Sequence, residues 1–143
     1  MARYAATVQT SKPIQETFDY LSDFSTTQEW DPGTTAAERL GEGPVGQGAR
    51  FKLRAVFMGR ESELVYEITE FEAPRRVVLR GENRAVVSTD EMTFDPVDGG
   101  TRVTYDADLR FKGLVRLAEP LLAREFRRVG DRALLGMQNA LGD

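Results

Sequence analysis

The order of hydrophobic and polar residues predicts a β-rich middle region with helical segments before and after it. Residues 3–10 are rich in strand formers. Residues 12–24 place apolar side chains at helical spacing, so we expect a short helix there, with Ser11 as its N-cap. A second helical turn is expected to close at Trp30, because the following sequence Asp-Pro-Gly is typical of a turn.

Alternation with a period of two predicts the strands. In residues 49–59, Phe51 and Leu53 alternate with Lys52 and Arg54, so one face of this strand is expected to be buried. Turn-forming residues separate it from further predicted strands at 61–71, 76–83, 84–97 and 101–113. The expected order is one strand, two short helices, about six strands and a long helix.

The period changes to that of an α-helix between residues 114 and 141. Pro120 either starts the stable part of this helix or kinks it. Strands gathered between terminal helices predict an α+β fold, a single domain over residues 1–143 with an antiparallel sheet of about seven strands. The apolar stripe of the helix contains Leu114, Ala118, Leu121, Leu122, Phe126, Val129, Ala133 and Met137.

Composition excludes several classes of function. The chain has no His and no Cys, which excludes disulfides, a thiolate nucleophile and the usual zinc or copper ligands. Its 23 acidic and 19 basic residues give a net charge of −4 without a basic run, which argues against nucleic-acid binding. The N-terminus lacks a long apolar run, so we expect no integral membrane association and a cytoplasmic location. We expect no metal or other cofactor.

Several stretches occur in a fixed order along the chain: FDYLSDF before WDPG, the loop VGQG, the turn FEAPRR and the hairpin FDPVDGGTRVT. In this order they resemble the polyketide cyclase/dehydratase-like family of the START-like, or SRPBCC, superfamily. The resemblance covers essentially the whole chain. It implies a helix-grip fold, in which a curved sheet wraps around a long C-terminal helix, and a deep cavity for lipid-, sterol- or polyketide-like ligands. It transfers no catalytic residues.

The only tryptophan is a candidate for such a cavity. Trp30 either packs as core under the long helix, with the Asp-Pro-Gly turn leading into the next strand, or lines the cavity near its mouth. In the second case its indole N–H would be available to a ligand. Because buried aromatic residues usually belong to the core, the first alternative is favoured.

Alternation assigns Phe51, Phe57, Tyr66 and Tyr105 to the inner face of the sheet. For each of them, core packing is the alternative to ligand contact. The tyrosines are the better candidates, because a buried hydroxyl needs a partner and could orient a ligand carbonyl.

Asp90 falls on the inner face if Met92 and Phe94 face the core, and Ser88 shares that face. A carboxylate in a poorly hydrated cavity has a raised pKa, which suits general acid or base catalysis. Alternatively, a bulge turns Asp90 outward, or Asp90 lies past the covered part of the sheet, and the frequency of edge irregularities favours this alternative. The predicted ligand-binding residues are Trp30, Phe51, Phe57, Tyr66, Asp90, Tyr105, Leu122 and Phe126.

Glu125 falls inside the apolar stripe of the predicted long helix. It either reaches into the cavity or pairs with Arg128 three residues on, and the surface pair is favoured. If Glu125 and Asp90 both faced inward, they could share a proton or bind a cationic group. They are therefore the two candidate catalytic residues.

Three functions are compatible with these sequence features. The leading hypothesis is that the protein, as a monomer or homodimer, binds a small hydrophobic molecule in an internal cavity. The second is a cofactor-independent polyketide cyclase or dehydratase, with Asp90 or Glu125 moving protons and Tyr66 or Tyr105 stabilising an enolate. The third is a protein-interaction module with a closed cavity and an exposed sheet edge.

Overall fold

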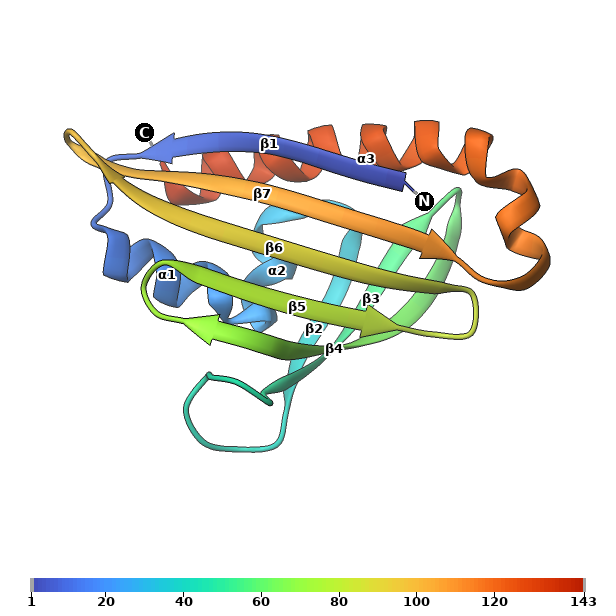
Figure 1. Cartoon of the computed structure of the whole chain (residues 1–143), viewed down its shortest axis with the longest axis horizontal. Coiled ribbons are helices and arrows are strands. Elements are labelled where there is room, and N and C mark those ends of the chain that lie inside the picture. Colours follow the sequence, from blue (N-terminus) through green and yellow to red (C-terminus); the bar gives the residue numbers. More distant parts are fainter. Residues whose placement is uncertain (1, 143) are drawn as a thin grey trace.

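Seven antiparallel strands form one sheet in the computed structural model, which describes residues 2–142. Their spatial order is β1-β7-β6-β5-β4-β3-β2, so strands β2 to β7 follow one another and β1 pairs with the last strand (Figure 1). The predicted α+β class and number of strands are confirmed. The strands are β1 (Ala2–Thr10), β2 (Thr34–Leu40), β3 (Arg50–Phe57), β4 (Arg60–Glu72), β5 (Arg76–Glu82), β6 (Val86–Val97) and β7 (Gly100–Phe111).

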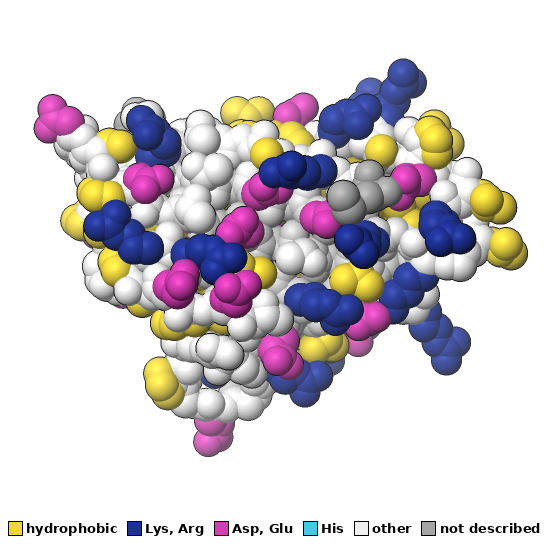
Figure 2. Space-filling model, in the orientation of Figure 1, with side chains coloured by type: hydrophobic (Ala, Val, Ile, Leu, Met, Phe, Trp, Pro, Cys, Tyr) yellow, Lys and Arg dark blue, Asp and Glu magenta, His cyan; other side chains and the backbone are white. Residues whose placement is uncertain are grey.

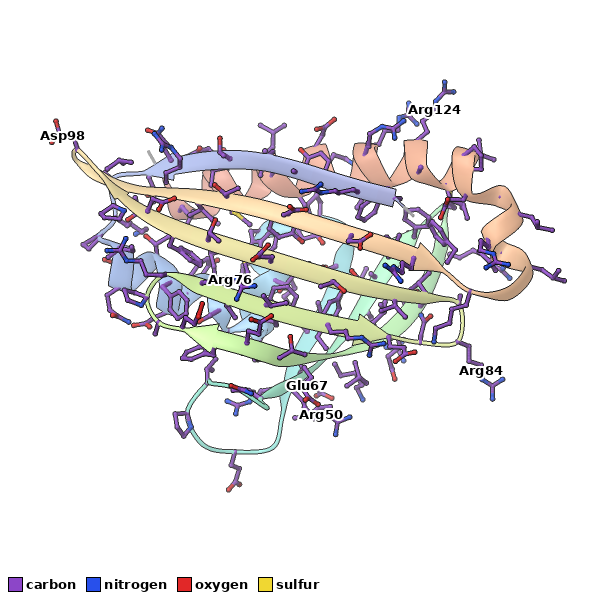
Figure 3. The ribbon with its side chains drawn as sticks, in the orientation of Figure 1. Arg50, Glu67, Arg76, Arg84, Asp98 and Arg124 are labelled. Carbon is purple, nitrogen blue, oxygen red and sulfur yellow. The ribbon has the colours of Figure 1, made fainter. Side chains whose placement is uncertain are left out.

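The two faces of the sheet differ because apolar and polar residues alternate along the strands. On the inner face, Phe51 and Leu53 of β3 are buried. On the outer face, the guanidinium of Arg76 in β5 lies 2.7 Å from Glu70 in β4 and 2.6 Å from Glu91 in β6. Figure 3 shows Arg76 among the side chains on this outer face. The interior therefore lies on one side of the sheet only.

The sheet is curved. Register irregularities interrupt the pairing of β2 with β3 and of β4 with β5. Such irregularities increase the local twist of a strand. In Figure 1, β2 and β3 run at a steep angle to β5, β6 and β7. The bend gives the sheet a concave side, which the helices occupy.

Two short helices connect β1 to β2. The prediction of Ser11 as N-cap is wrong: Pro13 occupies that position in an extended conformation, and no side chain caps the helix. The predicted apolar face is confirmed, since Phe18 and Leu21 have no exposed surface. The elements are α1 (Ile14–Ser22), the 3₁₀ turn η1 (Phe24–Thr26) and α2 (Thr27–Trp30).

The C-terminal segment begins as a 3₁₀ helix, η2 (Gly113–Ala118), and continues as α3 (Glu119–Leu141). Pro120 lies in the first turn of α3, so it starts the helix and does not kink it. The predicted stripe is wrong for Leu114 and Leu121, which are 85% and 60% exposed, and for Ala118, which is also exposed. The first six residues wind with a 3₁₀ period, and this end of the segment projects beyond the strands in Figure 1.

Two glycines allow α3 to approach its neighbours closely. A Cβ atom on Gly136 would lie 1.7 Å from the carbonyl oxygen of Trp30 in α2. A Cβ atom on Gly130 would lie 2.6 Å from the ring of Tyr4 in β1. Any larger residue at either position requires the helix or its neighbour to move. The second half of α3 is thus held between β1 and α2, and its own residue Met137 is buried.

The buried side chains divide the interior into two halves. We call one half the filled half, because it contains a large cluster of buried side chains that includes Phe18, Phe51, Ile68, Phe94 and Met137. We call the half at the other end of the sheet the hollow half. It contains only a small buried cluster of Ala2, Leu109 and Phe111, with partly buried neighbours that include Leu122 and Phe126.

Candidate ligand-binding site

A cavity of about 530 Å³ lies between the inner face of the sheet and the helices α2 and α3. This volume lies within the usual range for small-molecule sites. Every strand except β5, together with η1, α2, η2 and α3, contributes to its wall, and most of the lining side chains are apolar. Except for Phe51, all residues predicted to contact a ligand line this cavity: Trp30, Phe57, Tyr66, Asp90, Tyr105, Leu122 and Phe126.

One end of the cavity is bordered by exposed residues. Met58 and Arg60, at the turn between β3 and β4, and Val115 in η2 line the cavity and are exposed. Close to Val115 in η2, Leu114 and Leu117 are 85% and 80% exposed. Figure 2 shows hydrophobic and basic side chains together at this end of the molecule, on its right. The mouth of the cavity therefore lies between the β3–β4 turn and η2.

Asp90 occupies the inner face of β6, with only 4% of its surface exposed. The pairing of β6 with β5 and with β7 is regular along the strand, so the favoured alternative, a bulge that turns Asp90 outward, is wrong. The hydroxyl of Ser88 donates to Oδ1 of Asp90 at 2.9 Å. The hydroxyl of Tyr105, on β7, donates to Oδ2 at 2.5 Å. Both carboxylate oxygens thus accept a hydrogen bond within the cavity wall.

Burial dominates the electrostatics of this cluster. It raises the pKa of Asp90 to about 6, although the hydrogen bonds from Tyr105 and Ser88 lower it, and the charge of Asp31 raises it further. Burial and the charge of Asp90 raise the pKa values of Tyr66 and Tyr105 well above their ordinary value. At neutral pH the tyrosines are protonated and Asp90 is mostly ionised. The cluster can therefore accept a hydrogen bond or a proton from a bound molecule.

The environment of Trp30 combines both predicted alternatives. Its side chain is 3% exposed and packs edge-to-face against Phe24 and Tyr105, with ring centroids 6.5 and 6.3 Å away. It also lines the cavity. Its Nε1 atom, however, is wholly buried and has no hydrogen-bond partner among residues 2–142. The ring therefore offers the cavity apolar surface, while its N–H is enclosed by other protein atoms.

The turn after Trp30 explains why the sequence continues with Asp-Pro-Gly. Oδ1 of Asp31 accepts a hydrogen bond from the backbone N–H of Gly33 at 2.9 Å, and Oδ2 accepts one from the hydroxyl of Thr34 at 2.8 Å. Burial raises the pKa of Asp31, and these two hydrogen bonds and the charge of Arg132 lower it. Asp31 thus fixes the turn below α3 and also places a carboxylate in the cavity wall.

Two predicted residues do not line the cavity. Phe51 packs against Phe24, with ring centroids 6.4 Å apart, and the guanidinium of Arg39 lies 5.6 Å from the centre of its ring. Glu125 lies 3.7 Å from Arg128 and 3.9 Å from Arg132. The helical wheel places Glu125 in the apolar stripe, but its side chain instead joins ion pairs on α3. The arrangement therefore does not support a proton shared between Glu125 and Asp90.

Several polar residues of the site were not predicted to contact a ligand, among them Ser88, Asp31 and Tyr4. Alternation placed Ser88 on the inner face beside Asp90, but it was not named as a site residue. Asp31 was interpreted only as a turn residue, because the sequence does not indicate that this turn borders a cavity. Tyr4 lines the cavity and donates its hydroxyl to Asp131 of α3 at 2.8 Å, a contact between opposite ends of the chain. Only the folded structure reveals that contact.

A family model described as "Polyketide cyclase / dehydrase and lipid transport" matches residues 1–142. The chain belongs to this family. The resemblance inferred from the sequence motifs is thereby confirmed. No curated protein sequence matches the chain.

Solved structures share the fold of this polyketide cyclase/dehydrase family member at low sequence identity. The protein TTHA0849 from Thermus thermophilus has a TM-score of 0.81 and 16% identity, with 97% of this chain and 96% of that chain covered. An aromatase/cyclase from a Streptomyces species has a TM-score of 0.75 and 18% identity, covering 97% and 90%. A START superfamily protein from Mycobacterium smegmatis has a TM-score of 0.75 and 15% identity, covering 99% and 100%. The predicted helix-grip fold is confirmed.

Two further features of residues 2–142 concern metal binding and membrane insertion. No group of three or more acidic residues in this part of the family member is close enough together to hold a metal ion. Within the same residues, every helix is too short or too polar to span a membrane.

Proposed function

We propose that this family member binds a small hydrophobic or amphipathic molecule, lipid- or polyketide-like in character, in its internal cavity. The observation that carries the proposal is a mostly apolar hollow of about 530 Å³ with one polar cluster, at Asp90, in its wall. Burial of apolar ligand surface contributes about 25 cal/mol per Å². The polar cluster then fixes the orientation of the ligand.

Binding of a neutral fluorescent dye, Nile red, tests this proposal. We expect saturable binding with a fluorescence increase, and loss of binding in Leu109→Trp, because Leu109 lines the cavity and is 8% exposed. Leu114→Trp is the matched control, since Leu114 is 85% exposed and does not line the cavity. Equal dye binding by the two variants would contradict binding inside the cavity.

A second candidate function is a cofactor-independent cyclase or dehydratase acting on a polyketide-like carbonyl compound. The observation that favours it is the pKa of Asp90, which burial raises to about 6. A general base is most efficient when its pKa lies close to the pH at which the enzyme works. Asp90 would remove a proton next to the ligand carbonyl. The hydroxyl of Tyr105 is donated to Asp90, so Tyr66 is the tyrosine available to stabilise the enolate.

Turnover of candidate polyketide substrates by Asp90→Asn tests the enzymatic function. We expect a loss of at least about 100-fold in kcat if Asp90 is the base. Glu125→Gln is the matched control, because Glu125 pairs with arginines on α3 and does not line the cavity. Full turnover by Asp90→Asn would leave ligand binding as the function.

The third hypothesis, a protein-interaction module, requires an interior filled by side chains, and the cavity does not support it. The cytoplasmic location and the monomeric or homodimeric state stay predictions from the sequence.

A further inference from the structure

The charged residues that line the cavity are unevenly distributed. Four of them line it: Asp31, Arg60, Glu61 and Asp90. Arg60 and Glu61 are exposed at the β3–β4 turn, beside the mouth. Away from the mouth, Asp90 is buried and Asp31 is half-buried, and no Lys or Arg side chain among the described lining residues accompanies them. This part of the cavity wall therefore contains two carboxylates and no cationic side chain.

These carboxylates act on the same part of the cavity. Asp31 and Asp90 line the same cavity, and the charge of Asp31 contributes to the raised pKa values of Asp90, Tyr66 and Tyr105. Arg132 of α3 partly compensates Asp31. Asp90 has hydroxyl partners only, Ser88 and Tyr105, and these do not neutralise its charge. The potential at this end of the cavity is therefore negative.

Aromatic rings surround the same end. Trp30 and Tyr105 pack edge-to-face with centroids 6.3 Å apart, and Phe24 and Tyr66 do so at 5.2 Å. All four residues line the cavity. The faces of such rings attract cations and repel anions, most strongly where water is excluded. Rings and carboxylates thus favour the same sign of charge in a ligand.

Resting on the proposed function, we propose that the polar end of the ligand is a cation: an ammonium-type group on an otherwise apolar molecule, seated beside Asp90 among the rings of Trp30, Tyr66 and Tyr105. A ligand carboxylate or phosphate at this position would add a further negative charge without a counter-ion, which is costly in a poorly hydrated site. The cavity therefore discriminates against fatty acids and other anionic amphiphiles.

Three probes with one alkyl chain and different end groups test the charge preference: dodecylamine, dodecanol and dodecanoate. Each is titrated against bound Nile red at neutral pH, below its micelle concentration. We expect the amine to displace the dye at concentrations about tenfold lower than the alcohol, and the carboxylate to be the weakest. A carboxylate that competes as well as the amine would overturn the proposal. Failure of Nile red and of all three probes to bind would instead contradict the proposed function.

Two variants locate the preference. Asp90→Asn should reduce the ratio of amine to alcohol affinity to about one while the alcohol still binds. Glu125→Gln, the matched control outside the cavity, should keep the wild-type ratio. Leu109→Trp should lose amine binding as well, and an amine that still binds this variant would show attraction to the acidic surface and overturn the proposal. The ranking of the three probes on the wild-type protein needs no variant to fold.

Discussion

The filled and hollow halves of the interior lie under the same sheet and the same C-terminal segment, but they are packed differently. In the filled half, the rings of Phe18 and Phe94 meet edge-to-face with centroids 5.0 Å apart, and neither has more than 1% of its surface exposed. In the hollow half, Leu122 and Phe126 of α3 are only half-buried and border the cavity. We infer that the filled half mainly supplies stability, and that the ligand lies in the hollow half with its polar end against residues at the border of the filled half, such as Trp30 and Tyr66.

The difference arises because the helices cover one end of the sheet more completely than the other. The helices α1 and α2 lie under the filled half and contribute Phe18, Leu21 and Trp30 to its core. At the other end, the segment η2 projects beyond the strands and leaves Leu114 exposed, so fewer large side chains reach inward (Figure 1). Figure 3 shows Arg124, in the first half of α3, pointing away from the sheet.

Removing one ring from each half gives the largest expected effect. Phe18→Ala should lower the free energy of unfolding by about 3–5 kcal/mol, because it leaves a void in a packed core. Phe126→Ala should lower it by only about 1–2 kcal/mol, because Phe126 is half-buried and already borders a cavity. Urea unfolding of both variants measures the difference. Equal losses would contradict the division into a filled and a hollow half.

The pH dependence of stability tests the buried carboxylate. Because burial raises the pKa of Asp90 to about 6, above the value of about 3.9 for an unfolded chain, the folded state binds more protons between these values. The free energy of unfolding should therefore fall as the pH rises from about 4 to about 6, by up to about 3 kcal/mol from Asp90. Asp31, whose pKa burial also raises, acts in the same direction.

Urea unfolding of Asp90→Asn over the same pH range isolates this contribution. The variant should lose the part of the decrease that is due to Asp90 and keep the part due to Asp31. Glu70 and Glu82, whose ion pairs lower their pKa values, act in the opposite direction in both proteins. Asp98→Asn, an exposed site in the β6–β7 turn, is the control and should follow the wild-type curve. Parallel curves for the wild type and Asp90→Asn would show that folding does not raise the pKa of Asp90.

The smallest effect concerns the contact that holds α3 over the filled half. An exposed helical Gly→Ala substitution normally stabilises by about 1 kcal/mol. Gly136→Ala should instead destabilise by about 1–3 kcal/mol, because its Cβ atom would lie 1.7 Å from the carbonyl oxygen of Trp30. Gly46→Ala, where no atom lies within 4 Å of the added Cβ, should change stability by less than about 0.5 kcal/mol. Stabilisation by Gly136→Ala would contradict this close contact.

Much of this architecture is predictable because the periods of two and 3.6 residues report directly on burial. Alternation alone places Asp90 on the inner face of β6, and the bulge that was favoured against it is absent. The pattern left open whether Pro120 starts or kinks the helix, and the structure places it in the first turn of α3. Leu114 was misplaced because a helical wheel assumes one α-helical phase, whereas the favoured pairing of Glu125 with Arg128 is confirmed.

The contents of the site are less predictable for a physical reason. Whether Phe51 fills the core or borders the cavity depends on which end of the sheet α1 and α2 cover, and on the contact between Phe51 and Arg39. The hydrogen bond from Tyr105 to Asp90 requires the register between β6 and β7. Periodicity assigns a residue to a face, but not to a position along it.

Isotope-filtered NOE spectroscopy of the labelled protein with bound, unlabelled dodecanol tests the central claim most directly. The account predicts contacts from the alkyl chain to side chains of the hollow half, including Leu109, Phe111 and Phe126. It predicts none to Leu114 or Leu117 on the surface of η2. Contacts confined to those exposed leucines, or no saturable contacts at all, would contradict a ligand-binding cavity in the hollow half.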